Sequence, residues 1–407
     1  MKLPAVFLAG VIAASTVHAE NAAIYDANPE HPWNRLSAAL HTDTPAAFLA
    51  PAELARQMQI GKPYDDAVIA LDDFLAHHYE KKIATPVKRA LLQSELWATF
   101  DDVADATGGE QVKRKEIARR CAAIIQRLAL SETEIAGLPD TYAFTVKNRV
   151  FPTAYDSAHA QNAFLPPDLL DESGPWVMLS SSDFQPAAIQ HVKATQGRAV
   201  FYVLIHLPAG RQATIAYLKR LAEFPQPYVW DDSYAQFPYA RSPVKFNRDL
   251  PQFPPGTQVA LVRRMLLTTS TGELVVTPIT ESIQLRVYAK EPKEVGFDTV
   301  DAQNFYELRL VPDELFKGGG GLRERKGERP DSRLIFTKAT LFSMGGCQNC
   351  HGSPGVLSLN TYTHLFGPRP NTPWFEPSSV AWQNTHTLNW KKRDYTWGLL
   401  SALLDSR

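Results

Sequence analysis

The pattern of apolar and polar positions changes near residue 140. Between residues 33 and 138 apolar side chains recur every three or four positions. In the segment 113–130 these positions are Ile117, Cys121, Ile124, Ile125 and Leu128. Such spacing puts one apolar stripe on each helix, so this region is predicted to be helical. Ser131 followed by Glu134 predicts a capped start for one more short helix.

Beyond residue 140 the pattern indicates strands. Two continuous apolar runs, at 176–179 and 199–205, are typical of buried strands. The segments 257–269 and 273–288 flank a Ser-Thr-Gly turn and predict a long hairpin, with Phe305–Leu310 as a further strand beside it. A helix is expected at Ala213–Phe224. The pattern therefore predicts an α+β fold with an antiparallel sheet at its centre.

The same pattern suggests five parts. They are a signal peptide at 1–19, a helical domain at 20–139, an α+β domain at 140–315, an exposed linker at 316–333, and a C-terminal region at 334–407. The linker is inferred from four consecutive glycines, Gly318 to Gly321, and the arginine-rich stretch after them. The C-terminal region is expected to be small and made mainly of helices and loops.

The first residues read as a targeting segment. Lys2 supplies a positive charge, Leu3–Thr16 is apolar, and Val17-His18-Ala19 suits cleavage before Glu20. The apolar run is short for a membrane span, although an uncleaved anchor remains an alternative. No later stretch is apolar enough to cross a bilayer. We therefore expect a periplasmic or secreted protein with no transmembrane segment in its mature chain.

The composition of the chain limits the classes of protein and of partner that need to be considered. The 407 residues carry a net charge of -1 and are 44% hydrophobic, which is typical of a globular protein. This balance gives no reason to expect a nucleic acid as partner. Only three cysteines are present, which excludes a disulfide framework. One of them, Cys121, lies on an apolar helical face and is expected to be buried.

The other two cysteines form a motif. Residues 347–351 read Cys-Gln-Asn-Cys-His, which matches the C-x-x-C-H pattern of c-type haem attachment. Cys347 and Cys350 would add to the two vinyl groups of haem, and His351 would fall beneath the iron as its proximal ligand. Two alternatives stay open. The cysteines could form a redox-active disulfide, or they could bind zinc together with His351 and another histidine.

Through this motif the C-terminal region resembles monohaem c-type cytochromes. The resemblance implies one covalently bound haem c, one-electron transfer and an unidentified periplasmic redox partner. It also implies a C-terminal helix at Thr396–Leu404 packed near the haem. Elsewhere, stretches such as 31–36 and 255–263 resemble a family of uncharacterised secreted bacterial proteins, a likeness that implies no activity.

The sequence leaves several candidates for the distal ligand of the iron, which would occupy its sixth coordination position. No methionine follows Met344, so the distal ligand that is usual in small cytochromes is missing. His386 is the first choice and His364 the second. An open site, or a ligand from the middle domain such as His206 or Met178, is also considered. An open site would favour a haem enzyme or small-ligand sensor, and a third possibility is a non-haem protein that uses a Cys347–Cys350 disulfide.

Overall fold

The computed structural model describes residues 24–40, 62–83, 85–105, 111–180, 185–225, 228–230, 244–247, 249–289, 303–325, 351, 355–359 and 377–405. The predicted signal peptide, Cys347, Cys350 and His364 lie outside them. Within them the chain combines helices with a six-stranded antiparallel sheet of order β1-β2-β5-β6-β7-β8. The predicted α+β fold is confirmed.

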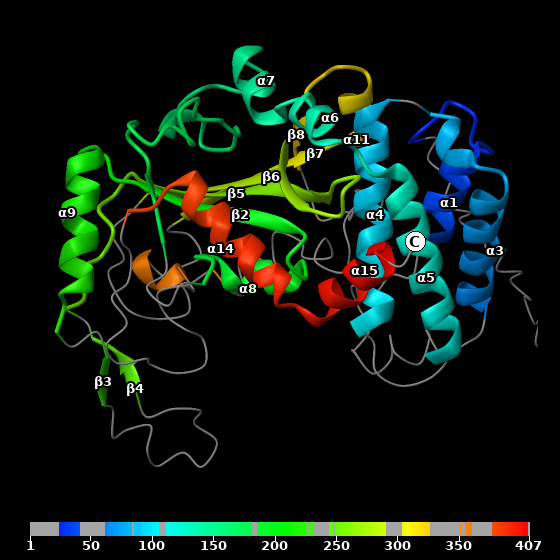
Figure 1. The fold of residues 1–407 in the computed structure, drawn as a ribbon. Coiled ribbons are helices and arrows are strands. Elements are labelled where there is room, and N and C mark those ends of the chain that lie inside the picture. Colours follow the sequence, from blue (N-terminus) through cyan, green and yellow to red (C-terminus); the bar gives the residue numbers. More distant parts are fainter. Residues whose placement is uncertain are drawn as a thin grey trace, which may run out of the picture.

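Helices gather at one end of the sheet (Figure 1). They are α1 (Pro32–Leu40), α3 (Lys62–Ala76), α4 (Pro86–Asp105), α5 (Gln111–Leu128) and the C-terminal α15 (Tyr395–Asp405). The shorter α6 (Glu132–Ala136) begins with the predicted capping box, because Ser131 and Glu134 bond each other's backbone nitrogens. The helix α7 (Thr141–Lys147) follows it, and η2 (Tyr79–Lys81) and η3 (Ser157–His159) are single turns. Among the described helices, none is both long and apolar enough to cross a membrane.

The sheet is built around the predicted hairpin. Its strands are β1 (Val177–Met178), β2 (Ala199–His206), β5 (Thr257–Thr268), β6 (Leu274–Tyr288), β7 (Gln303–Leu310) and β8 (Leu322–Glu324). The strands β5 and β6 pair from Thr257↔Tyr288 to Thr268↔Leu274, which confirms the hairpin. The strand β7 pairs with β6, as predicted for Phe305–Leu310. The strands β3 (Tyr228–Trp230) and β4 (Val244–Phe246) form a separate two-stranded antiparallel sheet.

The two faces of the sheet bury different cores. On β2, Val200, Tyr202 and Leu204 pack with the helical end of the molecule. Phe201 and Val203 point the other way, into a second core formed with α8 (Ile189–Ala194) and α9 (Arg211–Ala222). This second core also contains the buried Val356 of η6 (Gly355–Ser358) and Leu359, which follows it. A strand that is buried on both sides reads as one continuous apolar run, which explains the pattern at 199–205.

The C-terminal part of the chain is integrated into this fold. Its helix α14 (Val380–Lys392) packs on β2, and the preceding Ser378 donates to the carbonyl of Met178 at 2.8 Å. The predicted helix at Thr396–Leu404 is present as α15, but it packs on α4 and α5, with Trp397 against Trp97. The prediction that residues 316–333 are an exposed linker is wrong over their described part. There the strand β8 pairs with β7, and Leu322 of β8 is fully buried.

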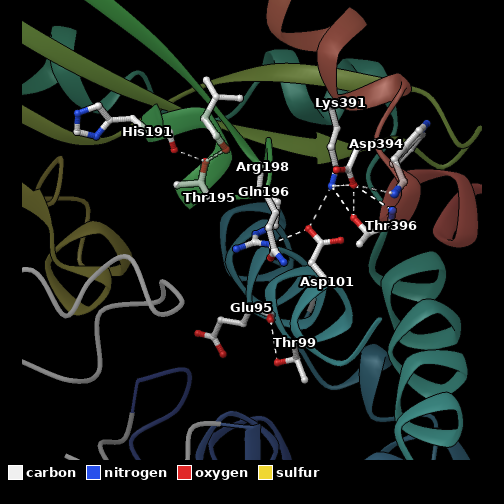
Figure 2. A network of polar contacts seen from close by, with 12 residues as sticks. Glu95, Thr99, Asp101, His191, Thr195, Gln196, Arg198, Lys391, Asp394 and Thr396 are labelled. Atoms are coloured by element: carbon white, nitrogen blue, oxygen red, sulfur yellow. Dashed lines mark hydrogen bonds and ion pairs between the residues drawn. The ribbon is translucent and has the colours of Figure 1, made fainter. Parts of the chain in front are cut away.

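A buried polar network fastens these parts together (Figure 2). Asp101 of α4 accepts from Arg198, just before β2, at 2.6 Å and from Lys391 of α14 at 3.2 Å. Lys391 also donates to Thr396 at 3.1 Å and lies 3.4 Å from Asp394. Asp101 and Lys391 have no exposed surface. The network therefore joins three segments that are distant in the sequence, and its charges depend on one another because water cannot solvate them.

Cys121 is fully buried in α5, as its helical neighbours predict, and burial raises the pKa of its thiol. We expect Cys121→Ser to lower the free energy of unfolding by about 1–3 kcal/mol, because it puts a hydroxyl into an apolar site. Urea denaturation measures this cost. Peptide mapping after iodoacetamide treatment provides a check, since rapid alkylation of Cys121 in the native protein would contradict its burial.

Candidate functional site

His351, the last residue of the motif, lies on the second-core side of the sheet. Its Nδ1 is 2.7 Å from the backbone carbonyl of Ser358, and its own carbonyl accepts from Gln303 of β7 at 2.9 Å. A carbonyl at Nδ1 fixes the proton there and leaves Nε2 as the ring's electron-pair donor. A hydrogen bond of this kind, from Nδ1 to a backbone carbonyl, orients an imidazole that binds a metal through Nε2.

Ser358 is itself held by the sheet. Arg286 of β6 donates to the Ser358 carbonyl at 3.1 Å and to its hydroxyl at 3.0 Å. The hydroxyl of Tyr288, two residues along the same strand, also bonds the Ser358 hydroxyl. Arg286 is 9% exposed and, within the described residues, is not paired with a carboxylate. The carbonyl that orients His351 is thus anchored to a central strand.

A second histidine lies beside His351. His191 belongs to the short helix α8, which ends in a turn at Gln196 (φ 50°) and Gly197 (φ 74°) before entering β2. Gly197 is required here because an added Cβ would lie 2.8 Å from the Trp390 ring of α14. The ring of His191 packs on Phe201 of β2, with centres 5.4 Å apart.

His191 and His351 form what we call the imidazole pair. Their ring planes are within 3° of parallel, and the ring centres are 5.9 Å apart. Burial, reinforced by the positive charge of Arg286, lowers the pKa of His191 to about 4 and that of His351 to about 3. Both rings are therefore neutral at pH 7, which is the form that binds metals.

Charged side chains line the same face of the sheet. Glu281 forms an ion pair with Arg263 at 2.5 Å, and Glu307 forms ion pairs with Arg309 at 2.8 Å and with Arg325 at 3.4 Å. Arg263 also lies over the ring of Phe201, 5.8 Å from its centre. The imidazole pair thus lies beside a buried band of charge that includes Arg286, whose charge faces no carboxylate in the described part of the chain.

The other predicted site residues lie elsewhere. His386 is on α14, where its ring stacks on Trp382 at 3.6 Å and its Nδ1 is 2.8 Å from the Trp382 carbonyl. Met178 packs in the first core, on the opposite side of the sheet from His351. His206 shares the β2 face of Tyr202 and Leu204, and it packs against Trp176 of the first core. The sheet thus separates Met178 and His206 from His351.

Sequence inspection missed His191, Arg286 and Ser358. Ser358 lies seven residues after the motif histidine, within reach of its ring, so a search for a nearby carbonyl could have included it. His191 and Arg286 carried no such sign, because no motif surrounds them. Pairing of β2 with β5, and of β5 with β6, brings them to His351.

Comparisons of this chain with protein-family models, with curated proteins and with solved structures found no match. The site is therefore interpreted from its residues alone. The donor set is compatible with haem: a neutral imidazole, a carbonyl on its Nδ1, and two cysteines just before it in the chain. The zinc and disulfide alternatives depend on Cys347 and Cys350, outside the described residues, and stay open.

Proposed function

We propose that this chain is an exported protein that binds one haem c covalently through Cys347, Cys350 and His351 and transfers single electrons. When bound, such a group supplies one iron that alternates between the ferrous and ferric states. The residues of this chain would hold that iron, orient its ligand and set the charge around it. The proposed location is the periplasm or outside the cell, and the redox partner would be another protein there.

The observation that carries this proposal is the hydrogen bond from His351 to the Ser358 carbonyl. In a C-x-x-C-H motif the histidine must present Nε2 to the iron while its other nitrogen is bonded. Here the contact is 2.7 Å, and Arg286 and Tyr288 hold its acceptor in place. A histidine in a disulfide motif has no need of such a support.

Charge on this face also supports the proposal. Haem carries two propionate groups, and arginine is well suited to bind a carboxylate through two parallel hydrogen bonds. Arg286 is buried beside the imidazole pair and bonds Ser358 through a single nitrogen, Nη1. Its remaining donors could bind a propionate, and its positive charge would favour the ferrous state of a nearby iron.

Covalent attachment is tested on the full chain, exported to the periplasm of a host with haem-maturation machinery. We expect the haem to stay with the polypeptide through acid-acetone denaturation. The intact mass should exceed that of the mature apoprotein by one haem, and cyclic voltammetry should show a reversible one-electron couple. A colourless protein with the apoprotein mass would contradict the proposal, and a mass two hydrogens lower would favour the disulfide alternative.

A further inference from the structure

The geometry points to His191 as the second axial ligand of the iron, opposite His351. This inference rests on the proposed function, because it concerns the same haem. It replaces the residue that the sequence favoured, His386, with one from a different element. It also makes the iron six-coordinate, with an imidazole on each side.

The distance between the two rings is the first argument. A metal–imidazole bond is about 2.0–2.1 Å long and a ring centre lies roughly 1.1 Å behind its nitrogen, so two imidazoles on opposite sides of one metal have centres about 6.2–6.4 Å apart. The rings of His191 and His351 are 5.9 Å apart.

The orientation of the rings is the second argument. Two axial imidazoles lie on one line through the iron, and their ring planes can therefore be parallel to each other. The planes of the imidazole pair differ by only 3°. His191 comes from a six-residue helix and His351 from beyond the sheet, so no local backbone repeat imposes this alignment.

The support around each ring is the third argument. The backbone of α8 is tied down by Thr195, whose hydroxyl donates to the His191 carbonyl at 3.2 Å, and by Arg198 in the buried network (Figure 2). Phe201 packs against the His191 ring from the sheet. His351 is held by Ser358 on the other side. Both rings are therefore placed by fixed elements, as a low-spin electron-transfer site requires.

The test uses haem-loaded full-length protein and compares His191→Ala with His386→Ala as the matched control. The wild-type ferric protein should give a low-spin electron paramagnetic resonance spectrum, and its ferrous form should resist carbon monoxide. His191→Ala should become high-spin and bind carbon monoxide while the haem stays covalent. Added imidazole should restore the low-spin spectrum. His386→Ala should match the wild type.

His191→Met provides a second variant in case His191→Ala does not fold. It keeps a ligating side chain of similar size, and it should add a methionine-to-iron charge-transfer band that the wild type lacks. A low-spin spectrum that His191→Ala leaves unchanged would overturn the inference. So would a spin change in His386→Ala alone. In both cases the covalent haem, and with it the proposed function, would stand. A wild-type chain without haem would overturn both.

Discussion

Replacing both motif cysteines, in Cys347→Ala/Cys350→Ala, is expected to abolish covalent haem entirely. The thioether bonds are the only attachments that survive denaturation, because His351 binds the iron by coordination alone. The double variant should therefore lose all colour in acid-acetone. Cys350→Ala alone should retain at most one thioether, with an altered absorption spectrum. Haem staining of denaturing gels and intact mass measure both effects.

Cys121→Ala is the matched control for this experiment. It removes the third cysteine of the chain, which is buried in α5, and should leave the haem content unchanged. His351→Ala separates attachment from ligation, since it keeps both thiols but removes the proximal nitrogen. Haem that stays covalent in the double variant would show that other residues attach it, contrary to the proposal.

Asp101→Asn is expected to destabilise the fold by about 3–5 kcal/mol, because it leaves the buried charges of Arg198 and Lys391 without their shared carboxylate. Stabilities of whole domains are about 5–15 kcal/mol, so the loss is a large share of the total. Burial already lowers the pKa of Lys391, and the Asp101 charge opposes that shift. Equilibrium unfolding in urea, followed by tryptophan fluorescence, measures the change.

Asp105→Asn is the control, since it makes the same substitution at an exposed position of the same helix and should cost less than about 0.5 kcal/mol. The double variant Asp101→Asn/Lys391→Met should be less destabilised than the two single changes added together, because the two side chains interact directly. Equal costs for Asp101→Asn and Asp105→Asn would show that the network contributes little.

Much of the fold could be predicted from local patterns. The β5–β6 hairpin follows from two long apolar segments around a Ser-Thr-Gly turn, and α5 follows from its apolar stripe. Over the described part of the predicted linker, the exposure was mispredicted because glycine and arginine content describes a whole stretch of sequence and not its individual residues. Leu322, inside that stretch, gains its burial by pairing with Leu310 of β7, a contact that composition does not show.

The sequence by itself determined which residues make up the motif: two cysteines, two spacers and a histidine are adjacent in the chain, so their spacing is local information. Only the tertiary structure decided what faces His351. His191 and Arg286 reach it because α8 folds back over β2 and because β6 lies at the centre of the sheet. Such contacts depend on strand order and on which face each residue occupies. A change of register by one residue would turn Arg286 toward the other core. The contacts to His351 therefore cannot be predicted from the sequence without knowing how the strands pair.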